Sequence, residues 1–126
     1  MSRSDGAAAL RAVRELADRI APVLLITELR TAAADELWLS PAYQRDVLAI
    51  HFTWKNDADA VRAVLPAIEA ALAPFSPRPH WGKVNLMDAA AIARAHPRIA
   101  DARALFERLD PEGMFSNAYL ERVGLR

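Results

Sequence analysis

Two segments rich in Val, Leu, Ile and Thr, roughly residues 23–32 and 47–55, constrain the fold most. Such residues are typical of β-strands. Helical patterns flank them: apolar residues recur at three-to-four spacing over residues 4–20 until Pro22 stops the helix. We therefore predict one α+β domain with at least two strands.

Three further helices are expected after the second strand. The first is capped by Asn56 or Asp57 and ends near Pro74, and the others cover about residues 87–95 and 98–109. The last of these is expected to bury an apolar stripe, made of Ile99, Ala102, Leu105 or Phe106, and Leu109. Residues 110–113 predict a turn and residues 117–123 a short closing segment. Trp38, Leu39 and Tyr43 are expected to anchor the long connection over residues 33–44.

Composition excludes several classes of protein. The 126 residues fit one domain, and 53% hydrophobic residues argue against a disordered chain. The 16 basic side chains equal the 16 acidic ones, whereas a general nucleic-acid binder carries a basic excess. Cysteine is absent, so disulfides and thiolate sites are excluded. The longest apolar run, residues 20–26, is too short for a membrane span, and no secretory signal begins at Met1, so we expect a cytoplasmic protein.

The chain also lacks a glycine-rich phosphate loop. Its four glycines (Gly6, Gly82, Gly113 and Gly124) are widely scattered, so neither a GxGxxG fingerprint nor a Walker-type loop is present. Any nucleotide cofactor must therefore be bound mainly by groups other than a glycine-rich loop of this chain. No His or carboxylate pair has the spacing of a metal site, and we expect none.

A polar cluster is predicted on one face of the sheet. Side chains two residues apart share a face, so Glu28 and Arg30 point together from the first strand, and His51 and Thr53 from the second. Phe52 and the other alternate residues of the second strand face the core. The cluster is interpreted either as a solvated face with a cross-strand ion pair or as a site for a polyhydroxylated ligand.

Two other segments are candidates. The first is residues 78–83, where Pro79 restricts the backbone that leads into the segment. Gly82 permits a close backbone contact or a positive φ, and His80 and Lys83 can donate hydrogen bonds. The alternative is a surface loop whose tryptophan fills the core. Residues 110–119 are either a further candidate or a helix-terminating turn. His96 is expected to be a cation at a helix C-terminus rather than a ligand.

Five blocks of sequence resemble a known family. They are ITELRT at residues 26–31, DELWLS at 35–40, HFTW at 51–54, RPHWGK at 78–83 and DPEGMFSNAYL at 110–120. Together they resemble the C-terminal part of the alditol (xylitol) oxidases, in the aldonolactone oxidase group of the vanillyl-alcohol-oxidase flavoproteins. The resemblance implies a small antiparallel sheet backed by helices, with residues 1–126 forming a single substrate-binding or cap domain and the FAD-binding domain absent from this chain.

The resemblance also implies site residues. Glu28, Arg30, Thr53 and Lys83 match positions that bind the polyol substrate. Lys83 and Arg30 would stabilise the oxygen that loses its proton, and His51 or His80 would accept that proton. His80 and Asn117 are assigned by the resemblance to binding the FAD cofactor.

The implied reaction is oxidation of a sugar alcohol, with sugar-lactone oxidation as the nearest rival. The implied partners are the substrate and an FAD-binding domain or subunit. Because such a domain normally packs on another, we expect an exposed apolar patch and a tendency to self-associate. Two alternatives stay open: an inactive remnant, and a binding module without redox chemistry.

Overall fold

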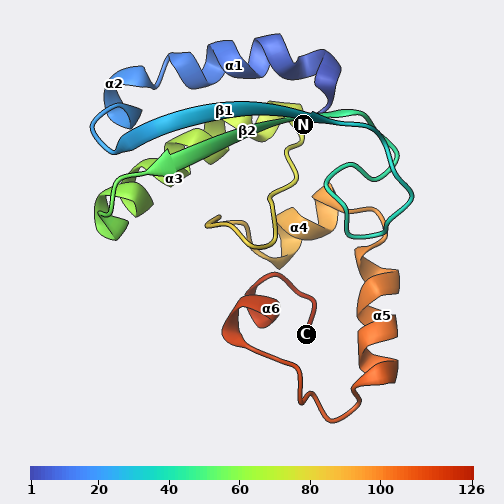
Figure 1. The fold of residues 1–126 in the computed structure, drawn as a ribbon. Coiled ribbons are helices and arrows are strands. Elements are labelled where there is room, and N and C mark those ends of the chain that lie inside the picture. The colour runs from blue at the N-terminus through green and yellow to red at the C-terminus, as the bar shows by residue number, and fades with distance from the viewer. The chain divides into compact units, whose positions relative to one another are not determined.

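A computed structural model describes residues 1–126 and confirms the α+β class (Figure 1). The elements in chain order are the 3₁₀ turn η1 (Arg3–Asp5), α1 (Gly6–Arg14), α2 (Ala17–Ile20), β1 (Leu24–Ala32), β2 (Val47–Trp54), α3 (Ala58–Leu72), the 3₁₀ turn η2 (Ala73–Phe75), α4 (Ala89–Ala95), α5 (Ile99–Leu109) and α6 (Ala118–Arg122). No helix combines the length and the apolar character needed to cross a membrane.

The chain divides into two compact units, each described here by itself. Met1–Ala34 and Gln44–Pro77 form the first, called the sheet unit because it contains both strands. Asp35–Tyr43 and Arg78–Arg126 form the second, called the helical unit, which contains α4, α5 and α6.

The strands pair antiparallel, as Figure 1 shows. Glu28 lies opposite His51 in the register, and a bulge between Leu24 and Ile26 shifts the pairing by one residue. Phe52 and Trp54 take the other face, where their rings stack with centroids 5.1 Å apart. The predicted alternation is therefore confirmed along β2 and, on β1, from Ile26 onward. At the bulge, Leu24 rather than Leu25 packs against the core.

The core of the sheet unit covers that second face. Its buried members come from the N-terminus, α1, α2 and α3: Met1, Ala9, Ile20, Val64, Ile68 and Leu72. Phe52 and Trp54 pack against them. The α3 helix begins as predicted, because the Asp57 carboxylate accepts a hydrogen bond from the Ala60 amide at 3.0 Å.

The helix expected over residues 4–20 is interrupted. It is divided into α1 and α2 at Glu15 and Leu16, where the Leu16 N–H bonds to the Val13 carbonyl in a tighter 3₁₀ pattern. Asp5 occupies the N-cap of α1, but its side chain makes no capping hydrogen bond. Helix α2 ends at Ile20, before Pro22, as expected.

The helical unit has its own small core of Ile92, Ala102, Val123 and Leu125. Ile99 and Phe106 pack against it, but Leu109, predicted to be buried, is 71% exposed. The prediction was wrong because α5 ends at Leu109 and the chain turns away at Asp110, so the end of the predicted stripe faces no other element.

His96 lies at the C-terminus of α4, as expected, where it is the C-cap residue. The sequence did not predict its burial: His96 is 1% exposed, and its ring lies 4.8 Å from that of Trp81. The anchors of the connection are confirmed: Tyr43 is buried, the Leu39 carbonyl accepts from the indole N–H of Trp81, and Trp38 lies beneath the Arg98 guanidinium.

Candidate functional site

The polar side chains of the sheet meet at the Glu28 carboxylate. His51 Nδ1 and Arg30 Nη2 each lie 2.8 Å from Glu28 Oε2. His51 reaches the carboxylate because it lies directly across the ladder, and Arg30 because it lies two residues along the same strand. Both contacts use Oε2, which leaves Oε1 available to accept a hydrogen bond from a ligand. The side chains of Glu28, Arg30 and His51 are 42%, 66% and 29% exposed, so this face is open to a ligand.

The charge of Glu28 determines the roles of its neighbours. The hydrogen bond from His51, then the hydrogen bond and charge of Arg30, hold the pKa of Glu28 below its ordinary value. An ionised carboxylate can only accept hydrogen bonds, so His51 Nδ1 must donate. In the neutral imidazole, Nε2 is then the atom that can accept a proton. The sheet thus carries a proton acceptor held in orientation by a carboxylate.

Thr53 shares this face of the sheet. It follows His51 by two residues on β2 and lies opposite Ile26 of β1. Its hydroxyl can both donate and accept a hydrogen bond. The four residues predicted to share a face therefore do share it, and hydrogen bonds link three of them, Glu28, Arg30 and His51.

The segment over residues 78–83 is held in place by its first and fourth residues. Arg78 Nε donates to the Ala95 carbonyl at 2.7 Å, and Nη1 donates to the carbonyls of Pro41 and Tyr43 at 3.2 and 2.8 Å. Trp81 donates to the Leu39 carbonyl at 2.7 Å and packs on the core of the helical unit. Trp81 therefore fills the core, as one of the two interpretations predicted.

Within this anchored turn, His80 and Lys83 are exposed. His80 Nδ1 accepts from the Gly82 amide at 3.1 Å, so a neutral His80 carries its proton on Nε2 and presents a donor there. Gly82 does not have a positive φ, and a Cβ there would meet the His80 ring at an ordinary 3.5 Å. The expected positive φ at Gly82 was therefore wrong, whereas a close contact of its backbone with a ligand stays a prediction.

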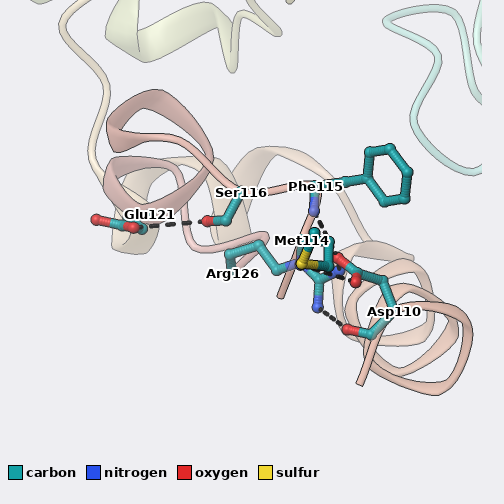
Figure 2. Close-up of polar contacts among 6 residues, drawn as sticks. All are labelled: Asp110, Met114, Phe115, Ser116, Glu121 and Arg126. Atoms are coloured by element: carbon teal, nitrogen blue, oxygen red, sulfur yellow. Dashed lines mark hydrogen bonds and ion pairs between the residues drawn. The ribbon is translucent and has the colours of Figure 1, made fainter. Parts of the chain in front are cut away.

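Figure 2 shows how the turn after α5 is built around Asp110. Its carboxylate accepts from the amides of Met114 and Phe115 at 2.8 and 2.9 Å and pairs with Arg126. The Phe115 hydrogen bond, with smaller contributions from Met114 and Arg126, lowers the pKa of Asp110 although burial opposes this. The positive φ of Gly113, +69°, completes the turn. The turn predicted over residues 110–113 is confirmed.

Asn117 has a structural role at the start of α6. Its Oδ1 accepts from the Leu120 amide at 3.0 Å and caps the helix. The side-chain Nδ2 can still donate to a ligand.

The structure thus brings Glu28, Arg30 and His51 into contact in the sheet unit, with Thr53 on the same face. His80, Lys83 and Asn117 belong to the helical unit. Sequence reasoning missed Arg78 as the residue that holds the segment carrying His80 and Lys83. No local pattern reveals that role, because its carbonyl partners lie 17 to 37 residues away.

The residues fit the polar parts of a flavin ring or a sugar better than the phosphates of FAD. A Cβ at Gly6 would clash with Leu48, and one at Gly124 with Ala89, so these glycines serve packing. No two glycines form a phosphate cradle. In contrast, His80 and Asn117 offer exposed donors. No group of three or more His, Asp and Glu side chains is placed to hold a metal ion.

Known proteins show sequence similarity along nearly the whole chain. Residues 1–123 match the family model described as D-arabinono-1,4-lactone oxidase. The chain is 49% identical over 120 residues to an alditol oxidase of a Streptomyces species, covering 95% of this chain and 29% of that protein, in its C-terminal portion.

Two further relatives are more distant. L-gulono-1,4-lactone dehydrogenase of Mycobacterium tuberculosis is 33% identical, with 96% of this chain and 28% of that protein covered. L-gulonolactone oxidase of Bos taurus is 33% identical, with 76% and 22% covered. The chain therefore spans less than a third of the length of these relatives. The extent of the family match confirms the resemblance seen in the five sequence blocks: the chain belongs to the D-arabinono-1,4-lactone oxidase family.

Proposed function

We propose that this chain is the substrate-binding part of an FAD-dependent oxidase that converts a terminal CH–OH group of a sugar alcohol to an aldehyde, with oxygen as acceptor. The observation that carries this proposal is the cluster in which His51 and Arg30 share one oxygen of Glu28 on an exposed sheet face. The 49% identity to an alditol oxidase supports it. We keep the cytoplasmic location expected from the sequence as part of this proposal.

The cluster suits a ligand rich in hydroxyl groups. A hydroxyl both donates and accepts, and the face offers matching groups: Glu28 Oε1 accepts, the Arg30 guanidinium donates, and Thr53 does either. Sites that hydrogen-bond each hydroxyl discriminate strongly against substrates lacking one, because a polar group is then left without a partner.

His51 would accept the proton of the reacting hydroxyl at Nε2. The ionised Glu28 holds its imidazole in that tautomer and stabilises the imidazolium that forms. Arg30 and Lys83 are cations suited to stabilise the oxygen as it loses the proton. Lys83 enters this scheme through the resemblance of the RPHWGK block.

The chemistry that FAD supplies when bound is acceptance of a hydride from the alcohol carbon and delivery of the electrons to oxygen, which becomes hydrogen peroxide. His80 and Asn117 would donate hydrogen bonds to its ring. Its phosphates would be held mainly by protein outside this chain, in an FAD-binding domain or subunit, because these residues contain no phosphate cradle.

Oxidation of a sugar lactone is the second candidate. The family model and two relatives carry the names of lactone enzymes, at 33% identity for the relatives. A lactone carries hydroxyl groups like those of a polyol, so the same cluster could bind it. The ratio of kcat/KM for xylitol to that for a gulonolactone distinguishes the two, and we expect the polyol to be favoured.

The deciding experiment measures peroxide from xylitol or sorbitol. The chain is assayed with FAD alone, and then with the flavin-binding part of the Streptomyces relative added. We expect activity only in the second case. No activity in either would favour a remnant or a binding module, whereas activity with FAD alone would show that this chain captures the flavin unaided.

Variants of the reconstituted enzyme test the assigned roles. His51→Asn should lower kcat by about a hundredfold or more, because the proton acceptor is lost. Lys83→Met should lower it by a similar factor, and Thr53→Val should act mainly on KM. The matched control is Arg62→Met, which removes an exposed cation of α3. Normal turnover of Lys83→Met would remove that residue from the mechanism.

A further inference from the structure

The backbone of Lys83 is held on both sides, although it belongs to no helix or strand. Its amide donates to the His80 carbonyl at 3.0 Å. Its carbonyl accepts from Asn85 Nδ2 at 3.2 Å. A long side chain delivers its charge to a defined point only if the backbone that carries it is ordered. These two hydrogen bonds supply that order.

Asn85 is itself held in place by the C-terminal helix α6. It is 8% exposed, and its carbonyl accepts from Arg122 Nη2 at 3.2 Å. Nη1 of the same guanidinium donates to the Met87 carbonyl, and the guanidinium lies over the Tyr119 ring, 5.2 Å from its centroid. A series of contacts therefore leads from α6 through Asn85 to Lys83.

Packing does not explain why this buried residue is an asparagine. Its Oδ1 is buried and has no hydrogen-bond partner. A buried polar atom without a partner costs stability, and a leucine, which branches at the same carbon, would not have that cost. The polar character of Asn85 is accounted for by its Nδ2, which donates to the Lys83 carbonyl.

We propose that Asn85 is a positioning residue, which orders the backbone of Lys83 and so holds the ammonium group where it can stabilise the oxygen that loses its proton. This inference rests on the proposed function, in which Lys83 has that role. Asn85 contacts neither substrate nor flavin in this scheme and acts only through Lys83.

The first test measures the order of Lys83 and needs no turnover. At 13.9 kDa the chain is small enough for NMR, and ¹⁵N relaxation reports the order of each amide. Asn85→Leu should lower the order parameter of the Lys83 amide from about 0.85 to below about 0.6. Asn56→Leu makes the same change at an exposed asparagine and should leave that order parameter unaltered.

The unfolding midpoint separates a positioning role from a structural one. Asn85→Leu removes a buried oxygen that has no partner, so its midpoint should equal or exceed that of the unaltered chain. An asparagine needed mainly for folding would give a lower midpoint. Should that variant fail to fold, Arg122→Met, which releases the Asn85 carbonyl, should also lower the order of the Lys83 amide.

The second test is a double-mutant cycle in the enzyme reconstituted with the flavin-binding part of the Streptomyces relative. Asn85→Leu should lower kcat by about tenfold with little change in KM, because Lys83 acts on the transition state. In a Lys83→Met background the same change should have no further effect, since the group that Asn85 positions is absent. A structural role would lower kcat by the same factor in both backgrounds.

Three results would overturn the proposal: an ordered Lys83 amide in Asn85→Leu, or in Arg122→Met where that variant replaces it, a lower unfolding midpoint, or equal losses of kcat in both backgrounds. If the unaltered reconstituted enzyme shows no turnover, the proposed function fails. The relaxation measurements would then still decide whether Asn85 orders Lys83, so the two failures are distinguishable.

Discussion

The sheet unit and the helical unit keep their shapes by different means. In the sheet unit, the strand ladder satisfies the backbone, and side chains from α1, α2 and α3 form an apolar core. In the helical unit, much of the backbone lies in connections, and guanidinium groups bind its carbonyls. Arg78 binds three carbonyls, and Arg122 donates to those of Asn85 and Met87.

This difference follows from where each backbone polar group finds a partner. Regular elements satisfy their own N–H and C=O groups, whereas a packed connection must obtain partners from side chains. The sheet unit should therefore be most sensitive to lost apolar volume, and the helical unit to lost charged hydrogen bonds.

The largest expected effect is a deletion in the apolar core. Ile68→Ala should destabilise the sheet unit by about 2–5 kcal/mol, because Ile68 is buried and its removal leaves a cavity. The control, Leu109→Ala, shortens an exposed side chain and should change stability by less than about 0.5 kcal/mol. Denaturant unfolding measures the change in the free energy of unfolding for each variant, and hydrogen exchange shows which unit opens. Equal effects of the two variants would contradict the assigned core.

The next effect should appear in the helical unit. Arg78→Met keeps much of the apolar stem but removes the donors to Ala95, Pro41 and Tyr43, at a cost of about 1.5–3 kcal/mol. Amide exchange should rise in residues 35–43 and 78–96 and stay unchanged in α3. Arg103→Met, which removes an exposed cation of α5, serves as the control. If the amides of residues 35–43 and 78–96 stay protected from exchange in Arg78→Met, this arginine does not hold the helical unit in its fold.

Acid should loosen the turn around Asp110. The pKa of this carboxyl is below its ordinary value in the folded chain, mainly because it accepts from the Phe115 amide. A depressed folded-state pKa contributes stability above the unfolded value, and this contribution is lost as the pH falls through the folded-state pKa. Amide protection of residues 110–116 should therefore decrease in acid.

Asp110→Asn should remove much of that acid dependence by weakening the turn at every pH. Glu112→Gln alters an exposed carboxyl in the same turn and should keep the unaltered profile. Identical acid profiles for the chain and Asp110→Asn would assign the loss of protection to another group.

The smallest effect on stability is expected at the candidate site itself. Glu28→Gln should leave the unfolding midpoint nearly unchanged, because the exposed cluster lies on the face opposite the core. The same variant should reduce polyol turnover in the reconstituted enzyme, because Gln cannot hold His51 and Arg30 as an anion does. A large loss of stability would instead make Glu28 a structural residue.

Short-range periodicity made part of this protein predictable. Side chains two apart on a strand must share a face, so Glu28 and Arg30, and likewise His51 and Thr53, could be grouped from sequence alone. The cap at Asp57 and the end of α2 before Pro22 followed from equally local chemistry. The resemblance of the five blocks then predicted the family, which the family match confirms.

The sequence by itself thus determined the two strands, the start of α3, the end of α2 and the alternation that gathers the polar face, but not the break between α1 and α2. Only the tertiary structure decided that Arg78 binds carbonyls up to 37 residues away, that His96 is buried beside Trp81, and that Leu109 is exposed. The physical reason is the distance along the chain over which each effect acts. Backbone geometry makes alternation a property of adjacent residues, whereas burial and long-range hydrogen bonds depend on which elements meet after folding.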